Sequence, residues 1–349
     1  MQKEAASPLI EPIPTAARKV ERASNLKALA TKKESGIFAL LVLLCAVTGW
    51  ENPRFFSHEN LVNTANLIGL FGIFSIGAGL VIITSGIDLS VGSMIALNGM
   101  LSVIALTEWH LPWPLAVLFA LAIPMTLGAV QGVLIARFKM QPFIVTLCGL
   151  LIYRGAARFI SNDMTKGFGD AAGFRTLQRL ASGTFFGLPA PFVYLVAVSV
   201  VMWIVLHRSI YGRYLLAVGR NEEATRFSGV NTKLVIGGSY VLAGLLTGIS
   251  GILFAFYTNS VSPSTQGNFY ELYGIAAAVL GGCSLRGGEG SIVGILIGTT
   301  LLLVLQNLVN LLGIPSSLNF AVMGAVVLGG VLADQLLRNR VGRKRAISN

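Results

Sequence analysis

Side chains that could carry out catalysis are few in this sequence, and their spacing fits no common enzyme. The three histidines, His58, His110 and His207, lie far apart along the chain. The three cysteines form no CxxC pair, and no HExxH, GxSxG or GxxxxGK[ST] motif is present. We therefore expect no catalytic residue, no metal site and no nucleotide-binding loop in this chain.

Charged and hydroxyl side chains gather instead at two glycine-bounded breaks in otherwise apolar sequence. The first break is SGIDLSVGS at 85–93, and the second is GGCSLRGGEGS at 281–291. An ionisable residue between two apolar segments is a candidate for function, because burying its charge is costly. Asp88 could therefore contact a ligand directly. It could also cap a helix that begins at Leu89, by accepting the first amide hydrogens.

A third polar stretch has the pattern of a short helix that is capped at both ends. Asn221 is a suitable N-cap, and Glu222 and Glu223 then place negative charge in the first turn. Gly229 suits the position that follows the C-cap. Such a helix would present both charge signs and one aromatic ring to a partner protein, although a solvated loop helix would show the same pattern.

These polar stretches are set in a chain whose composition is that of a membrane protein. Hydrophobic residues make up 54% of the chain and charged residues 12%, about half the charged fraction of a soluble domain. Apolar segments of roughly 20 residues can cross a hydrocarbon core of about 30 Å. Because these segments are continuous rather than alternating, helices rather than a barrel would satisfy the backbone there.

The sequence therefore predicts an all-α integral membrane protein, a polytopic helical bundle of about ten transmembrane helices. The spans are expected at about 36–50, 60–84, 92–107, 113–136, 142–160, 191–207, 234–257, 270–283, 291–312 and 317–337. The segment 161–190, which is basic although assigned outside, and the short span 270–283 fit this count least well. If either is re-entrant, the number of crossings lies between eight and eleven.

Basic residues gather near the two ends of the chain and in a few loops, which explains the net charge of +11 better than nucleic-acid binding does. Since Lys and Arg are retained on the cytoplasmic side, an even number of spans places both termini there. The expected organisation is a disordered cytoplasmic tail at 1–35, a transmembrane domain at 36–337 and a basic cytoplasmic tail at 338–349. The loop at 208–233 is then cytoplasmic.

Glycine is abundant, at 40 of 349 residues, and it recurs at helical spacing inside the spans, as at Gly244, Gly248 and Gly251. Small residues at this spacing allow helix backbones to approach closely in lipid, so we expect tight helix packing. The two breaks also resemble each other, which suggests an internal duplication. Because six expected spans separate the breaks, the two copies would be parallel.

Three segments occur in the order SGIDLSVGSM, AVGRNEEATRFSGVN and GGCSLRGGEGSIVGILIGTTLLLVLQNLVNLLGI. They resemble the signature regions of the ribose/xylose-type ABC permease family, and with the spans the resemblance covers about residues 36–337. It implies a multi-pass permease subunit of the bacterial inner membrane that translocates a monosaccharide. The residues that match the family's ATPase-coupling region are Gly219, Asn221, Glu222, Glu223, Ala224, Ser228 and Gly229.

The resemblance also implies the partners of such a permease. An ATP-binding cassette subunit would use ATP and Mg on the cytoplasmic side, and a periplasmic sugar-binding protein would deliver the sugar outside. A second permease copy, identical or related, would complete the assembly in membrane lipid. This chain itself would bind no cofactor.

Polar side chains in or beside the spans are the candidates for the solute pathway. They are Asn66, Asp88, Ser90, Asn98, Gln131, Asn307 and Asn310. Each could instead form a hydrogen bond to a neighbouring helix, typically worth about 0.6 kcal/mol.

Other functions predict different residues. An ion-coupled secondary transporter would need several carboxylates within the membrane, whereas only Asp88 is expected to lie deep, with Glu271 and Asp334 near span ends. A membrane enzyme would need a cluster of His, Asp or Glu side chains. An ABC permease for a branched-chain amino acid or a signalling furanone would share the features above.

Overall fold

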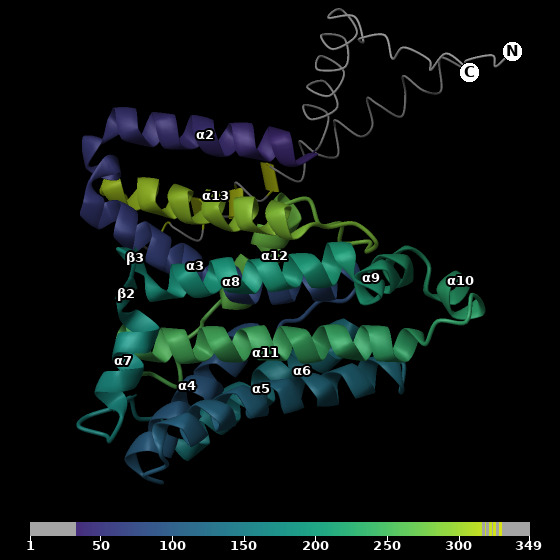
Figure 1. Ribbon diagram of the computed structural model, residues 1–349, viewed down its shortest axis with the longest axis horizontal. Helices are drawn as coiled ribbons and strands as arrows, with labels where there is room; N and C mark the ends of the chain where they lie inside the picture. Colours follow the sequence, from purple (N-terminus) through teal and green to yellow (C-terminus); the bar gives the residue numbers. More distant parts are fainter. Residues whose placement is uncertain (1–32, 316–317, 319–320, 323, 326–327, 330–349) are drawn as a thin grey trace, which may run out of the picture.

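The computed structural model describes residues 33–315, 318, 321–322, 324–325 and 328–329, which form helices and a few two-residue strands (Figure 1). The longer helices are α2 (Lys33–Glu51), α3 (His58–Ile83), α4 (Val91–Thr107), α5 (Trp113–Ala136), α6 (Pro142–Ile160), α8 (Ala190–Trp203), α11 (Thr232–Thr258) and α13 (Ile292–Leu311). The shorter elements are η1 (Pro53–Phe56), β1 (Lys166–Gly167), α7 (Phe174–Ser182), β2 (Thr184–Phe185), β3 (Leu188–Pro189), η2 (Ile204–Arg208), α9 (Ile210–Arg220), α10 (Glu222–Phe227), β4 (Ser260–Val261) and α12 (Tyr270–Leu280).

Within these described residues, six helices are long and apolar enough to cross a membrane: α3, α5, α6, α8 continued by η2, α11 and α13. The helices α2, α4 and α12 are apolar but shorter. These nine helices lie where nine of the ten spans were expected, so the all-α membrane fold is confirmed. The tenth span, at 317–337, falls largely outside the described residues, as do the tails at 1–32 and 338–349.

Helices α3, α4 and α11 form the centre of the bundle. In α3, 83% of the most apolar window is buried, against 28% in α6. Almost every residue of α4 is buried as well. A helix that is apolar around its whole circumference is typically enclosed by other helices. The helices α5, α6 and α8 instead leave apolar side chains exposed on the outside of the bundle.

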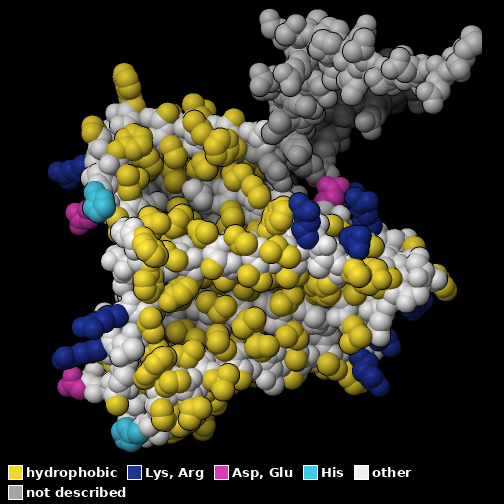
Figure 2. Space-filling view, viewed as in Figure 1, with side chains coloured by type: hydrophobic (Ala, Val, Ile, Leu, Met, Phe, Trp, Pro, Cys, Tyr) yellow, Lys and Arg dark blue, Asp and Glu magenta, His cyan; other side chains and the backbone are white. Residues whose placement is uncertain are grey.

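The helices run side by side between two ends of the molecule (Figure 1). We call the end with α9 and α10 the α10 end, and the end with α7, β2 and β3 the α7 end. In the face that Figure 2 shows, Lys and Arg side chains lie at these two ends, and hydrophobic side chains cover the surface between them. This distribution is the one expected of helices that span a lipid bilayer.

Close packing of α5 against α11 depends on small residues, as the glycine content predicted. A Cβ atom added to Gly128 would lie 2.3 Å from the carbonyl oxygen of Tyr240. One added to Gly132 would lie 2.9 Å from the Cα atom of Gly237. At these positions backbone rests directly on backbone, which is how helices without a hydrophobic driving force between them associate in lipid.

The first break separates α3 from α4. The span expected at 92–107 begins within one residue of α4, which starts at Val91. Ser90 occupies the N-cap position without a capping side-chain hydrogen bond. Of the two roles considered for Asp88, capping a helix that begins at Leu89 is therefore wrong. Asp88 instead accepts a hydrogen bond from the amide of Ser90, so its carboxylate closes a turn that precedes the helix.

The second break follows α12, which has 11 residues and is therefore about 16 Å long at 1.5 Å per residue. That is about half of a hydrocarbon core of about 30 Å, so α12 cannot cross a membrane alone. The two breaks lie against each other, because the hydroxyl of Ser85 donates a 2.9 Å hydrogen bond to the carbonyl of Arg286.

The segment 161–189 forms a small structure at the α7 end. Strand β1 pairs with β4 in antiparallel orientation, and β2 pairs with β3. An acidic partner neutralises one of the basic residues that made this segment fit the span pattern poorly, and an acid of the segment pairs with a basic residue just outside it. Lys166 pairs with Glu108 in the α4–α5 loop, and Arg158 at the end of α6 pairs with Asp163.

Candidate functional site

The short helix that the polar stretch predicted is present as α10. The side chain of Asn221 accepts a 2.9 Å hydrogen bond from the amide of Ala224. Gly229 follows the helix with φ at 86°, a conformation that glycine adopts without strain. Both predicted caps are therefore confirmed, and α10 is defined by hydrogen bonds within its own short stretch of chain.

Glu222 fastens α10 to two other elements. Its carboxylate pairs with Lys139 in the α5–α6 loop and accepts a 3.1 Å hydrogen bond from the hydroxyl of Thr232 in the first turn of α11. Partial burial alone would raise the pKa of Glu222. The hydrogen bonds and charges around it, from Lys139, Thr232 and Arg226, outweigh that and hold the pKa below its ordinary value.

The outer side of α10 is suited to binding a partner. The ring of Phe227 is 81% exposed, and the guanidinium of Arg226 lies 5.5 Å from the centre of that ring. Glu223 is exposed beside them. Aromatic and arginine side chains are enriched among the residues that dominate binding energy at protein interfaces. Because α10 protrudes from the α10 end (Figure 1), these side chains are accessible to another protein.

Three of the predicted pathway residues meet in one buried cluster, which we call the polar cluster: Asp88, Ser90 and Gln131. One carboxylate oxygen of Asp88 accepts hydrogen bonds from the amide of Ser90, at 2.8 Å, and from its hydroxyl, at 2.6 Å. The side-chain amide of Gln131 donates to the same hydroxyl oxygen at 2.8 Å. All three residues are at most 4% exposed.

The polar cluster has unused hydrogen-bonding capacity. The carbonyl oxygen of the Gln131 side chain is buried and has no hydrogen-bond partner among the described residues. The same holds for the hydroxyl of Tyr240 on α11, which interacts electrostatically with Asp88. Buried polar atoms usually have a partner in the protein or in an ordered water. A water or a hydroxylated solute would therefore find both a donor and an acceptor here.

The other four predicted pathway residues do not join this cluster. Asn98 lies about two turns further along α4, where its amide donates to the carbonyl of Gly248 on α11 at 2.9 Å. Asn307 on α13 donates to Asn60 at 2.8 Å, across the contact with α3. Asn66 is half-buried on α3, and Asn310 is exposed near the end of α13.

The surroundings of two charged residues were not predicted from the sequence. Glu271 lies in the first turn of α12, at the end of its expected span, but it is only 7% exposed and interacts electrostatically with Arg154 and Asp88. Arg154 on α6 donates hydrogen bonds to the carbonyls of Pro263 and Gln266, at 3.0 and 2.7 Å. Arg154 could have been noticed, because it interrupts an apolar span. Glu271 could not, because its depth depends on the short irregular segment before α12.

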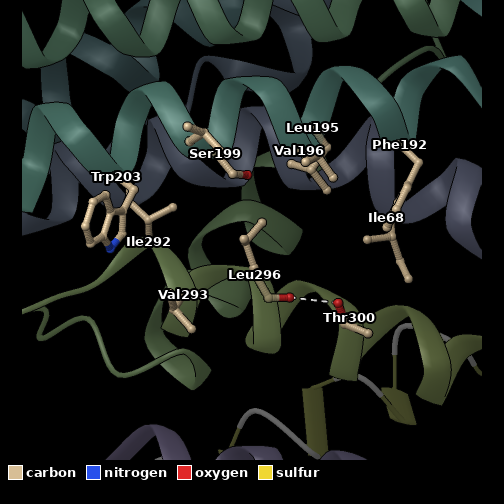
Figure 3. Close-up of a pocket in the computed structure, with 11 residues that line it drawn as sticks. Ile68, Phe192, Leu195, Val196, Ser199, Trp203, Ile292, Val293, Leu296 and Thr300 are labelled. Atoms are coloured by element: carbon tan, nitrogen blue, oxygen red, sulfur yellow. Dashed lines mark hydrogen bonds between the residues drawn. The ribbon is translucent and has the colours of Figure 1, made fainter.

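An apolar groove of about 410 Å³ runs between α3, α8 and α13 (Figure 3). It is lined by Ile68, Phe192, Leu195, Val196, Ser199, Val200, Trp203, Ile292, Val293, Leu296 and Thr300. The hydroxyl of Thr300 is already committed to the carbonyl of Leu296. This lining offers a polar solute few hydrogen bonds, so the groove is not where we place the solute pathway.

No three His, Cys, Asp or Glu side chains come together as a set of metal ligands in the part of the chain that the structure describes. The arrangement therefore offers two features with chemical meaning. One is the docking surface on α10, made of Glu223, Arg226 and Phe227. The other is the polar cluster, which lies inside the bundle and is suited to weak hydrogen bonding rather than to covalent catalysis.

Comparisons with known proteins agree with this architecture. The model of the family described as "Branched-chain amino acid transport system / permease component" matches residues 60–331. The ribose import permease protein RbsC of Escherichia coli (strain K12) is 40% identical over 302 residues, which is 86% of this chain and 93% of that protein.

Two further relatives extend the comparison to another organism and another sugar. RbsC of Bacillus subtilis (strain 168) is 37% identical over 301 residues, covering 86% of this chain and 91% of that protein. The L-arabinose transport system permease protein AraH of Escherichia coli (strain K12) is 34% identical over 302 residues, covering 86% and 88%. No solved structure matches this chain. The protein is therefore a multi-pass permease component that belongs to the branched-chain amino acid transport system / permease component family, within which it is similar to the permeases of sugar import systems.

Proposed function

We propose that this chain is the membrane-spanning subunit of an ABC importer that carries a ribose- or xylose-like monosaccharide across the bacterial inner membrane. The observation that carries this proposal is the high identity to permeases named for ribose, over nearly their whole length. The relative named for L-arabinose supports a sugar in general. The description of the family names branched-chain amino acids, but the three relatives described above are named for ribose and arabinose.

The direction of transport follows from the orientation of the bundle. The α10 end is the cytoplasmic end if Lys and Arg are retained inside, since more of the described Lys and Arg residues lie there, Lys139, Arg220 and Arg226 among them, than at the α7 end. The amino terminus would then be cytoplasmic, because α2 begins at that end. The span expected at 317–337, which falls largely outside the described residues, would return the carboxyl terminus to the same side. The α7 end would face the periplasm and receive the sugar from a binding protein.

The subunit that drives transport would bind at the docking surface on α10. This chain has no nucleotide-binding loop, so a separate cassette subunit would hydrolyse ATP with Mg and move α10. A second permease copy would complete the transporter in the membrane. ATP can drive the exchange of outward and inward access only if it binds the two states with different free energy.

The solute pathway would include the polar cluster. A sugar passing through needs hydrogen bonds that are weak enough to break, and the buried oxygen of Gln131 and hydroxyl of Tyr240 lack partners among the described residues. Asp88 and Ser90 are buried and hydrogen-bonded to each other. Opening the bundle around the first break would expose these groups to the sugar.

Transport in membrane vesicles tests the proposal directly. The chain would be produced with its cassette subunit and binding protein, and uptake of radiolabelled ribose would be measured. We expect uptake to stop without ATP and to continue after the proton gradient is collapsed. Unlabelled xylose or arabinose should compete, whereas leucine should not. Uptake that follows the proton gradient, or that only leucine inhibits, would contradict the proposal.

The docking surface has its own test in the same vesicles. Exchanging Glu222→Lys together with Glu223→Lys reverses the charge of α10 and places Lys beside Lys139. We expect uptake to be abolished while the protein remains in the membrane. Glu51→Lys with Glu59→Lys makes the same change in charge at the α7 end and serves as the control. Normal uptake by the α10 double variant would refute the docking assignment.

A further inference from the structure

Three separate segments of the chain meet at one point of the α10 end. They are Ile83–Ser85 at the end of α3, Gly219–Arg220 at the end of α9, and Arg286–Gly288 in the second break; together we call them the junction. The amide of Gly288 donates to the carbonyl of Ile83 at 2.8 Å. The hydroxyl of Ser85 lies 2.9 Å from the carbonyl oxygen of Arg286 and 3.2 Å from that of Gly219.

Apart from the hydroxyl of Ser85, the contacts given for the junction are made by backbone atoms, and its glycines have no room for larger side chains. A Cβ atom on Gly219 would lie 1.8 Å from the carbonyl oxygen of Ile83 and 2.4 Å from the amide nitrogen of Gly288. One on Gly287 would lie 2.1 Å from the hydroxyl oxygen of Ser85. Contacts of this kind are stiff, because no flexible side chain can absorb a displacement of one segment relative to another.

The position of the junction connects the docking surface to both breaks. A single residue, Asn221, separates the last residue of α9 from α10, so a movement of α10 must displace Gly219. On the α3 side, Ser85 is followed after two residues by Asp88 of the polar cluster. On the other side, the junction is part of the second break itself. The junction is thus a covalent and hydrogen-bonded route from α10 to both breaks.

Ser85 provides the side chain that contacts both of the other segments in the junction. It adopts φ at 64°, in the left-handed region that non-glycine residues seldom occupy. Its hydroxyl has one proton but two acceptors, on α9 and in the second break. A donor with two acceptors can hold both segments or exchange between them when they move apart. Glycine would adopt this φ with less backbone strain than serine. What serine adds at this position is its hydroxyl.

We propose that the junction transmits movement of α10 to both breaks, with Ser85 as the positioning residue that holds the end of α9 and the second break in register. The inference rests on the proposed function, since it assigns a route for the work of the ATPase. It predicts that weakening the junction uncouples ATP hydrolysis from sugar transport. Substituting a residue that has only a structural role would lower ATP hydrolysis and sugar transport in proportion.

The first experiment measures sugar transported per ATP hydrolysed in proteoliposomes that contain the assembled transporter. Ser85→Ala and Ser85→Gly both remove the hydroxyl, and the glycine variant also removes the strain at positive φ. We expect hydrolysis to be kept while the transported sugar per ATP falls about fivefold in both, the ratio that one hydrogen bond of ordinary net strength allows. Ser85→Asn should restore much of the ratio, because asparagine tolerates this φ and offers an amide donor.

Ser75→Ala is the matched control, in the helix α3 that ends two residues before Ser85. The hydroxyl of Ser75 is buried and donates to the carbonyl of Phe71 within α3, so its loss leaves the junction intact. We expect this variant to transport as much sugar per ATP hydrolysed as the unaltered protein does. A ratio that is unchanged in Ser85→Ala and Ser85→Gly would overturn the proposal. Hydrolysis and transport that fall in proportion would also overturn it.

A second experiment needs no transport and therefore separates this inference from the proposed function. Hydrogen exchange is measured in the detergent-solubilised chain for peptides that cover 81–90 and 281–291. Disturbing α10 by Glu222→Lys should speed exchange in both peptides, whereas Glu59→Lys at the α7 end should not. If exchange at both breaks stays at the unaltered rate, α10 is not connected to them and the inference fails, whatever the transported solute is.

Discussion

The side-chain amide of Gln131 on α5 donates a 2.8 Å hydrogen bond to the hydroxyl oxygen of Ser90, at the start of α4. Both residues are at most 2% exposed. The bond joins the first break to the neighbouring helix in the interior of the bundle. The stability of this contact can therefore be tested separately from transport.

Ser90→Ala removes the acceptor and leaves the amide of Gln131 buried without a partner. We expect the variant to unfold more readily, by about 1–3 kcal/mol, the usual cost of one unsatisfied buried group. Adding Gln131→Leu should restore part of this stability, because the orphaned amide is then removed as well. Unfolding of the detergent-solubilised protein, followed by tryptophan fluorescence, gives the three values. Strictly additive losses would contradict the coupling.

The ion pair between Glu222 and Lys139 predicts an acid-sensitive attachment of α10. Because the folded protein holds the pKa of Glu222 below its ordinary value, the pair contributes its full stabilisation at neutral pH. That contribution is lost as the pH falls through the lowered pKa. Hydrogen exchange over residues 222–232, corrected for the intrinsic rate, should accelerate only in acid. Glu222→Gln should show no such step, and an identical acid response in that variant would exclude Glu222 as its cause.

Gly128→Ala should destabilise the contact between α5 and α11. The added methyl group would lie 2.3 Å from the carbonyl oxygen of Tyr240, so the helices must separate, at a cost of about 1–3 kcal/mol for overpacking of this kind. Gly155→Ala on α6 is the matched control, since nothing lies within 4 Å of its added methyl group. Melting temperatures in detergent compare the two. Equal stability would show that α5 and α11 are less closely packed than described.

Arg154 is predicted to hold the segment that leads into α12. Its guanidinium donates to the carbonyls of Pro263 and Gln266, which Arg154→Ala would leave without that donor. We expect a cysteine introduced at Ser264 to react with a water-soluble maleimide several-fold faster in the Ala variant. Arg154→Lys keeps the charge but lacks the fork of donors, so an intermediate rate is expected. Equal rates in all three proteins would contradict this role.

Local features of this protein could be predicted from the sequence. The helices were located because an uninterrupted apolar run of the right length has few alternatives in a membrane. The caps of α10 were predicted because Asn221 and Ala224 are three residues apart, so their hydrogen bond depends on nothing else in the fold. The start of α4 was predicted within one residue, whereas the role of Asp88 was not, because its carboxylate accepts the amide of Ser90 in a turn before the helix.

Only the tertiary structure decided which polar residues act together. Asn60 and Asn307 are separated by 247 residues in sequence, and Ser90 and Gln131 by 41. In lipid the contacts between helices depend on small residues and on the rotation of each helix about its axis. The sequence of a uniformly apolar span gives little information about the rotation of that helix about its axis. For this reason the junction of Ser85 with α9 and the second break, and the burial of Glu271, became visible only in the folded chain.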